Sequence, residues 1–561
     1  MQTSFVLVRT AYFVLVTEPN TIGDHDKDKQ QLSPPSPPPL SSLSHFYTHP
    51  PPPPPPHQPQ PAAHPHLNLH NSIKQIWDQW FGQPPARACK DIAINQSYWI
   101  ISNETMRPFV DIPDMSDLSV GESVCVRVIV PLKPSNSTDA FVPFPSTPWD
   151  SILLDMVGLS SGISIPVNLQ PVSDMRNRRQ DSVHIYEANV ELRDIDVYHP
   201  EGFLEFRDAR WNPEGPLLPQ QYSPEPLDIT EAQQVVVKDE HRTSPYSLWK
   251  YTELPLCTDS NAEGRWVDVN SIPFDPEIVP LPDNLNRVWL PYTCRLRRVS
   301  YAQFAQCLVS KYPRVHWYGD SNVRRSLKKI SSLGEWCSTK EDQESAVCTC
   351  EDYRSNFTRF SIHARNTFFD IDAVDGGWSL ANETDFARVP ENKARMAVFK
   401  IEGLTARNVS PWKDRFENGT VKMFGDPQAV IISLVNWDAA FTSLEFFASQ
   451  VALLIGRLNE TYLPDTRIIL RTGQYHCCYS DQSATGRKYS QLRNRYFNDM
   501  HIGMIKEALG DLYDVRVWDV ASVAQRRPLV GRQESQTCYS NHVRSEVVEV
   551  ENQILFNSLC N

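Results

Sequence analysis

The sequence predicts a multidomain protein in which a β-sandwich is followed by an α/β domain with a mostly parallel sheet. Between residues 87 and 235, short runs of alternating apolar and polar side chains are separated by turn-rich segments, as in a sandwich. From residue 236 to 561, apolar runs alternate with segments of helical periodicity. With 561 residues, the chain is long enough for two or three domains that each bury a core.

Residues 1–86 fit neither pattern. Phe5–Val16 is mostly apolar, but it is too short to span a bilayer and lacks the order of a signal peptide. It can be interpreted as a weak signal, a damaged anchor or a misassigned first exon. The proline-rich stretch that follows includes an unbroken run at Pro50–Pro56, and we expect it to be an extended, disordered stalk. A spacer is favoured over a ligand for SH3 or WW domains.

Three alternating runs support the sandwich: Val124–Val130, His184–Arg193 and Gly202–Arg207. Each places apolar residues on one face of an extended strand, the pattern of a sheet with one buried face. No candidate chemistry falls in this part, so we expect a β-domain without catalytic residues.

The α/β domain is predicted from short apolar runs with helical patterns between them. Near-continuous apolar strands separated by helices are typical of a parallel sheet covered on both faces. The runs are Val315–Tyr318, Ala429–Val435, Ile468–Leu470 and Val515–Trp518, and the helical patterns are Phe441–Leu458 and Tyr496–Leu509. No stretch after the N-terminal one is long enough to cross a membrane.

Charge, cysteines and glycosylation signals indicate a protein of the secretory pathway, either in the Golgi lumen or outside the cell. The net charge of -13 argues against a nucleic-acid partner. Twelve cysteines fit a disulfide framework whose connectivity is not readable from sequence. Neither Cys348-Thr349-Cys350 nor Cys477-Cys478 has zinc-site spacing, so we expect no metal and no cofactor. Asn-x-Ser/Thr glycosylation signals occur at Asn95, Asn103, Asn136, Asn356, Asn382, Asn408, Asn418 and Asn459.

Ser321 is the candidate nucleophile. The run Val315–Tyr318 leads into Gly319-Asp320-Ser321 and then into a helical pattern, which places the serine at a strand-to-helix turn. The start of a helix also offers free backbone N–H groups to a developing oxyanion. A Gly-Asp-Ser sequence in this setting resembles the nucleophile block of GDSL-type hydrolases. Asp320 is expected to hold the turn.

A serine needs a base, and two histidines are candidates. His542 precedes a last helix with an apolar stripe, near the end of the chain, where GDSL-type enzymes carry their base; His476, which follows the Ile468–Leu470 run, is the alternative. In those enzymes an acid stands three residues before the histidine, and here that position is Tyr539. Asp519 or Glu546 could replace the acid, or the pair could act as a Ser–His dyad with a backbone carbonyl as the orienting group.

The remaining site candidates surround the expected oxyanion position. Asn436 follows the Ala429–Val435 run and could donate its amide N–H to an oxyanion, or it could cap the following helix. The backbone N–H of Ser321 is the natural second donor. Arg324, with Arg325 beside it, is a candidate for binding an anionic or polyhydroxyl substrate, with a solvated helix face as the alternative. Trp437 could stack on a sugar ring, or pack in the core.

Taken together, these motifs resemble the PC-esterase superfamily, and most closely the neurexophilin and PC-esterase (NXPE) family. The resemblance covers roughly residues 87–561. It is carried by Cys257 … Gly264-Arg265-Trp266-Val267 … Cys294, by Gly319-Asp320-Ser321 with Arg324, and by Phe206–Gly215, which is similar to the end of an Ig-like module. The C-terminal Asp-x-x-His block is only half matched, because His542 is present and the acid is not.

The resemblance implies an Ig-like sandwich at 87–235 and a three-layer α/β SGNH-like (GDSL-type) PC-esterase domain at 236–561. It also implies a carbohydrate O-acetyltransferase or acetylesterase whose partners are a glycan or polysaccharide substrate and an acetyl donor, with an acyl-enzyme formed on Ser321. Because some members of the family have no shown activity, the alternative is a catalytically inactive glycoprotein that uses the two domains for binding. A membrane tether at the N-terminus is a further expectation.

Overall fold

A computed structural model describes residues 87–100, 106–114, 117–132, 148–172, 183–207, 224–230, 233–239, 244–334, 366–381, 388–405, 412–413, 416, 421–475, 490–528 and 542–561. The apolar segment and the stalk expected in 1–86 lie outside these residues. The described residues belong to one compact unit that combines several sheets with helices. In the described ranges, no helix has the length and apolar character needed to cross a membrane.

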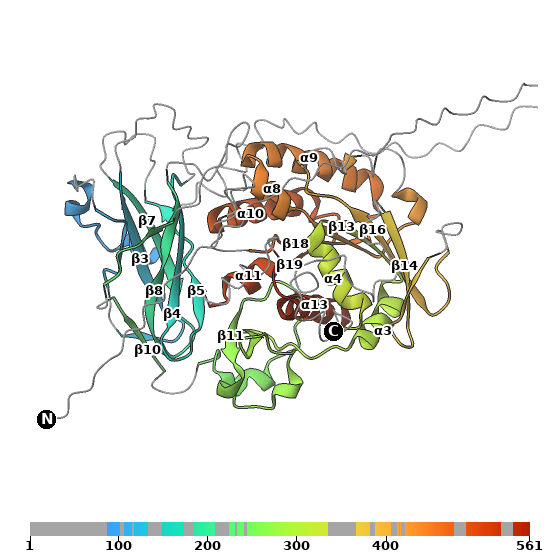
Figure 1. The fold of residues 1–561 in the computed structure, drawn as a ribbon, viewed down its shortest axis with the longest axis horizontal. Helices are drawn as coiled ribbons and strands as arrows, with labels where there is room; N and C mark the ends of the chain where they lie inside the picture. The colour runs from blue at the N-terminus through green and yellow to red at the C-terminus, as the bar shows by residue number, and fades with distance from the viewer. Residues whose placement is uncertain are drawn as a thin grey trace, which may run out of the picture. The chain divides into compact units, whose positions relative to one another are not determined.

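Two sheets pack face to face in the first part of this unit (Figure 1). Their strand orders are β1-β3-β7-β6 and β2-β10-β8-β4-β5, with β9 paired to β8. Apolar side chains such as Val126, Leu154 and Tyr198 fill one core between them. The three alternating runs overlap β3, β7 and β8, so the predicted strands are present. The strands are β1 Phe109–Asp111, β2 Leu118–Ser119, β3 Ser123–Pro131, β4 Ser151–Gly158, β5 Ser164–Pro166, β6 Gln170–Pro171, β7 Val183–Glu191, β8 Asp196–Phe206, β9 Glu225–Pro226 and β10 Val235–Lys238, preceded by α2 Arg87–Lys90 and η1 Gln96–Ile100.

A hairpin of β11 (Gly264–Asp268) and β12 (Arg287–Pro291) follows, with Trp266 opposite Trp289. The Trp266 side chain is buried, and its Nε1–H donates to the carbonyl of Val523 at 2.7 Å. The Gly-Arg-Trp-Val block is therefore a buried strand that anchors the hairpin. The 3-10 helix η3 (Leu248–Glu253) precedes it, and η4 (Val269–Ser271) and η5 (Pro276–Ile278) lie in the connection between its two strands.

The α/β part is built on a seven-stranded sheet of order β15-β14-β16-β13-β17-β18-β19. Neighbours from β16 to β19 pair in parallel, whereas β14 is antiparallel to β16 and to β15. A mostly parallel sheet is therefore confirmed, but with an antiparallel edge that the apolar pattern did not predict. The strands are β13 Arg314–Gly319, β14 Asn366–Asp372, β15 Trp378–Leu380, β16 Lys393–Lys400, β17 Ala429–Ser433, β18 Arg467–Arg471 and β19 Val515–Trp518.

Helices cover both faces of this sheet (Figure 1). Along β13, Val315 and Trp317 point into the core shared with α3, α4, α11 and α13, whereas Tyr318 points into the core shared with α8, α9 and α10. This alternation is the expected period of two for a strand buried on both sides. The helices are α3 Tyr301–Lys311, α4 Ser321–Ser331, α8 Val435–Phe441, α9 Leu444–Thr461, α10 Gln491–Leu509, α11 Val520–Gln525 and α13 Ser545–Cys560, with η6 at Lys422–Phe424.

Parallel pairing places the carboxyl ends of β13, β17 and β18 at one edge of the sheet. Tyr318 pairs with Ile432, and Ser433 pairs with Arg471. The residues that follow these three strands therefore converge on the same edge, where ligands bind in open α/β sheets.

Three disulfides join the described cysteines: Cys89–Cys125, Cys257–Cys294 and Cys307–Cys560. The last closes a separation of 253 residues, against 36 for the first. Because a cross-link restricts the unfolded chain more when the loop is longer, the double variant Cys307→Ala/Cys560→Ala should lose about 5 kcal/mol of unfolding free energy. Chemical denaturation checks this, and a smaller loss than that of Cys89→Ala/Cys125→Ala contradicts it.

Candidate active site

Ser321 lies at a tight turn between β13 and α4, at the carboxyl edge of the sheet. Asp320 caps α4, because its Oδ1 accepts the backbone N–H of Asn322 at 2.9 Å. Gly319 is required for close packing, since a Cβ atom there would lie 2.5 Å from Cγ2 of Val323. The Gly-Asp-Ser sequence thus combines a small residue, a helix cap and a partly exposed serine at the first position of the helix.

His542 meets Ser321 across 221 residues of sequence. Its Nε2 lies 2.8 Å from Ser321 Oγ, and the histidine is 5% exposed. This distance is within the range over which a general base takes a proton. The next residue, Val543, is packed in the core beside α4, and its carbonyl accepts a hydrogen bond from Nη2 of Arg325. Val543, the residue after the histidine, is therefore fixed both by its side chain and by its backbone carbonyl.

The two carboxylates considered as replacement acids lie elsewhere. Within the described residues, Asp519 caps α11 through the backbone N–H of Ser522 and accepts the hydroxyl of Thr472 at 3.2 Å. Glu546 lies in the first turn of α13. Neither forms a described hydrogen bond with His542. Tyr539 and His476 lie outside the described residues.

Asp320 provides a buried carboxyl directly beside the serine. It is 1% exposed, and burial raises the pKa of its carboxyl. The Asn322 backbone hydrogen bond and the positive charges of Arg471 and Arg324 oppose that rise in pKa. Its position as helix cap agrees with the expectation that it holds the turn.

Asn436 lies in the first turn of α8, at the same edge of the sheet. Its Nδ2 donates to the carbonyl of Gln474 at 2.9 Å, and its Oδ1 accepts the Gln474 backbone N–H at 3.0 Å. The side chain thus joins the end of β17 to the segment after β18. Donation by Asn436 to an oxyanion stays a prediction.

The interpretation of Arg324 and Arg325 as a solvated helix face is wrong. Their side chains are buried, at 7% and 0% exposure, because α4 packs against both β13 and α13. Trp437 is half-buried, and its ring centroid lies 5.5 Å from that of Phe441. Substrate binding by Arg324 and Trp437 stays a prediction.

Of the eight glycosylation signals, Asn95 and Asn459 lie within the described residues. Asn95 is exposed, and its Oδ1 accepts hydrogen bonds from the backbone and hydroxyl of Ser97. Asn459 is half-buried within α9.

Sequence reasoning missed a group of buried polar side chains around this edge. Glu551 of α13 accepts hydrogen bonds from Arg471 at 2.8 Å and from Gln474 at 2.7 Å, and all three residues are fully buried. A signal was available, because charged residues at the core-facing positions of a last helix are rare unless they are paired.

Asp438 is a second buried carboxyl near the site. It accepts the backbone N–H groups of Leu404 and Thr405 and the Thr405 hydroxyl, at 2.7–2.9 Å for Oδ1. Burial, with a smaller contribution from the negative charge of Asp320, raises the pKa of Asp438 to about 7 against the opposing hydrogen bonds from Thr405 and Leu404. These contacts fix the chain after β16 against α8.

The described residues offer no metal site at the serine. One group of three side chains has suitable spacing, Cys89, Cys125 and Glu187, but its two sulfur atoms form a disulfide and so supply no thiolate ligand. The described chain contains no other such group.

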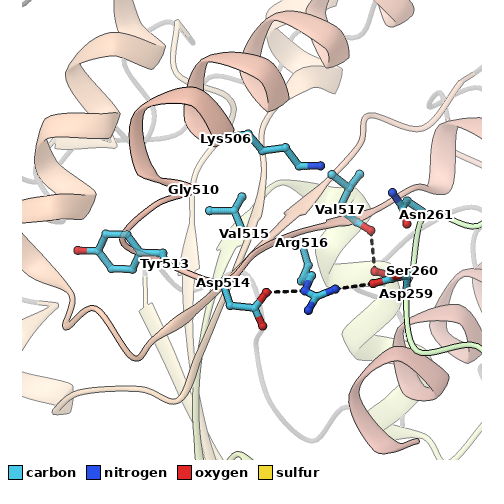
Figure 2. Close-up of a pocket in the computed structure, with 10 residues that line it drawn as sticks. All are labelled: Asp259, Ser260, Asn261, Lys506, Gly510, Tyr513, Asp514, Val515, Arg516 and Val517. Atoms are coloured by element: carbon cyan, nitrogen blue, oxygen red, sulfur yellow. Dashed lines mark hydrogen bonds and ion pairs between the residues drawn. The ribbon is translucent and has the colours of Figure 1, made fainter.

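A cavity of about 480 Å³ lies away from Ser321, beside the start of edge strand β19 (Figure 2). Inside it Arg516 forms ion pairs with both Asp514 and Asp259, so its charge is compensated by the protein itself. Cavity volume therefore does not locate the candidate active site in this molecule. The hydrogen bond between Ser321 and His542 locates it instead.

Comparisons with known proteins leave the family open. No protein-family model, no curated protein and no solved structure matches this chain.

The raised pKa of Asp438 predicts a pH-dependent stability. The native carboxyl holds its proton up to about pH 7, whereas an unfolded aspartate loses it near pH 4, so the native state binds more protons between these values. This contribution to stability is present at low pH and is lost as pH rises. When the pH is raised from 5 to 7.5, the free energy of unfolding should fall by about 2 kcal/mol more in the wild type than in Asp438→Asn, which lacks the titrating carboxyl.

Denaturant titrations at the two pH values measure this difference. The exposed Asp511→Asn variant is the matched control for loss of one carboxyl, and it should follow the wild type. Equal pH dependence in Asp438→Asn and the wild type contradicts the assignment.

Proposed function

We propose that this protein is a serine esterase or O-acyltransferase of the SGNH (GDSL) type that acts on acetylated carbohydrate in the secretory pathway. The observation that carries the proposal is the 2.8 Å hydrogen bond between Ser321 Oγ and His542 Nε2. A serine hydroxyl becomes an effective nucleophile when a base within hydrogen-bond reach takes its proton. Its position at the start of α4 adds backbone donors for the oxyanion.

The proposed reaction has two steps. Ser321 Oγ attacks the carbonyl carbon of an acetyl ester while His542 Nε2 takes its proton, and His542 then gives this proton to the leaving alcohol. The acetyl group remains on Ser321. In the second step His542 takes a proton from water or from a sugar hydroxyl, which attacks the acetyl-serine. Water yields free acetate, whereas a sugar hydroxyl yields a new ester.

The substrate class comes from the resemblance to the NXPE family, as does the assignment of the first two sheets to an Ig-like module. Arg324 and Trp437 are the proposed substrate contacts. The secretory pathway is supported by the three disulfides, which form and persist in oxidising compartments.

One observation favours a second function, that of a non-catalytic glycoprotein. The position three residues before His542 carries Tyr539 instead of an acid. In GDSL-type enzymes the acid at this position orients the imidazole, so a tyrosine in its place favours a binding role. The α/β domain would then act as a binding scaffold.

A fluorophosphonate probe separates the two functions, because it reacts with activated serines. The wild type should be labelled at Ser321, Ser321→Ala should lose the label, and His542→Gln should be labelled about 100-fold more slowly because the base is absent. Peptide mass spectrometry locates and quantifies the adduct. Ser331→Ala, in the last turn of the same helix, is the matched control and should be labelled like the wild type.

Two results would sink the enzyme proposal. The first is absence of labelling in folded wild-type protein, which favours the scaffold. The second is labelling that persists in Ser321→Ala, which places the reactive group elsewhere.

A further inference from the structure

Glu551 occupies the centre of the buried polar group behind the candidate dyad. It is carried by α13, the helix that follows His542, and it is completely buried. Its carboxylate accepts Nη2 of Arg471 at 2.8 Å and Nε2 of Gln474 at 2.7 and 2.8 Å. Burial raises the pKa of this carboxyl, and the charge of Arg471, the Gln474 hydrogen bond and the charge of Arg325 act in the opposite direction.

Contacts between α4 and α13 hold the segment that carries His542. Arg325, whose positive charge lowers the pKa of the Glu551 carboxyl, donates Nη2 to the carbonyl of Val543. The neighbouring Asn552 donates its Nδ2 to the carbonyl of Ser326 at 3.1 Å. These contacts hold α13 against α4, and so hold the histidine against the serine.

A second set of contacts connects Glu551 with Asn436. The side chain of Gln474 binds the carboxylate, while its backbone N–H and carbonyl pair with the Asn436 amide. The preceding Gly473 is fixed by its N–H bond to Oδ1 of Asn498 at 2.8 Å. Glu551 therefore fixes Gln474, whose backbone in turn binds the side chain of Asn436, the candidate oxyanion donor.

Arg471 completes the arrangement at the end of β18. Its guanidinium lies 5.1 Å from the ring centroid of Trp518, whose Nε1–H donates to the backbone carbonyl of Glu551 at 2.8 Å. The charge of Arg471 also acts on Asp320, the residue that caps α4. The Glu551 carboxylate thus binds the end of β18 through Arg471 and the segment after β18 through Gln474.

We infer that Glu551 is a positioning residue, which aligns the His542 segment and the Asn436–Gln474 pair with Ser321 without touching the substrate. This inference rests on the proposed function. A shift of a reacting group by about 1 Å can lower a rate about 100-fold. A residue that aligns the reacting groups can therefore change the rate strongly without contacting the substrate.

The test compares Glu551→Gln with Glu549→Gln. Glu549 is a matched control, because it is a buried carboxyl on the same helix whose partners, Lys329, Tyr301 and Gln553, lie away from the site. In full-length protein, Glu551→Gln should lower the rate of fluorophosphonate labelling at Ser321 about 10- to 100-fold relative to Glu549→Gln. Thermal unfolding, followed by circular dichroism, reports whether the two variants are folded to the same extent.

Gln474→Met provides a second route, because it removes the Gln474 donor and leaves the Glu551–Arg471 pair in place. It should reproduce the loss of rate even if Glu551→Gln fails to fold. Labelling of folded Glu551→Gln and of Gln474→Met at the rate of Glu549→Gln overturns the inference.

The outcome is separable from that of the proposed function. If the wild type is not labelled, the proposed function fails, and the alignment is then measured by the ¹⁵N resonances of the His542 ring, assigned with His542→Gln. Glu551→Gln or Gln474→Met should shift these resonances, because the hydrogen bond to Ser321 changes, and Glu549→Gln should not. Unchanged ring resonances in the folded Glu551 and Gln474 variants overturn the inference on this arm.

Discussion

The hydrogen bond between Ser321 and His542 depends on the packing of α13 against α4. These helices are far apart in sequence, yet both lie on the same face of the seven-stranded sheet and share one apolar core. The serine is held by the end of β13, and the histidine is held by the start of α13. Their alignment is therefore a property of tertiary packing, and any change that moves one helix along the other moves His542 away from Ser321.

Buried charge is the second constraint on this edge of the sheet. Asp320, Asp438 and Glu551 are all buried, and burial raises the pKa of each carboxyl. A buried carboxyl is tolerated only where donors or opposite charges surround it. Here those donors are backbone N–H groups, a hydroxyl, an amide and arginine side chains. The hydrogen bonds that offset the free-energy cost of burying these carboxyl groups also fix the geometry of the site.

Much of the sheet was predictable from sequence, because its central strands are nearly continuous apolar runs. The turn at Ser321 was predictable too, since Gly-Asp-Ser supplies close packing and a helix cap in three residues. The strand β16 was missed because Arg395 interrupts its apolar pattern, and that residue is tolerated through a buried ion pair with Asp370 of β14. Glu551 and Gln474 were missed for a related reason, since their partners come from distant segments of the chain. A charged residue on the buried face of the last helix signals that a partner exists, but the local sequence does not say which residue it is.

The central claim is that Ser321 carries an acyl group during turnover. Incubation of the protein with an activated acetyl ester, rapid acid quenching and peptide mass spectrometry test it most directly. The account predicts one added acetyl group on Ser321 in the wild type, decaying as water or a sugar hydroxyl is supplied. Acetylation confined to lysines or other serines, with Ser321 unmodified in folded protein, would contradict it.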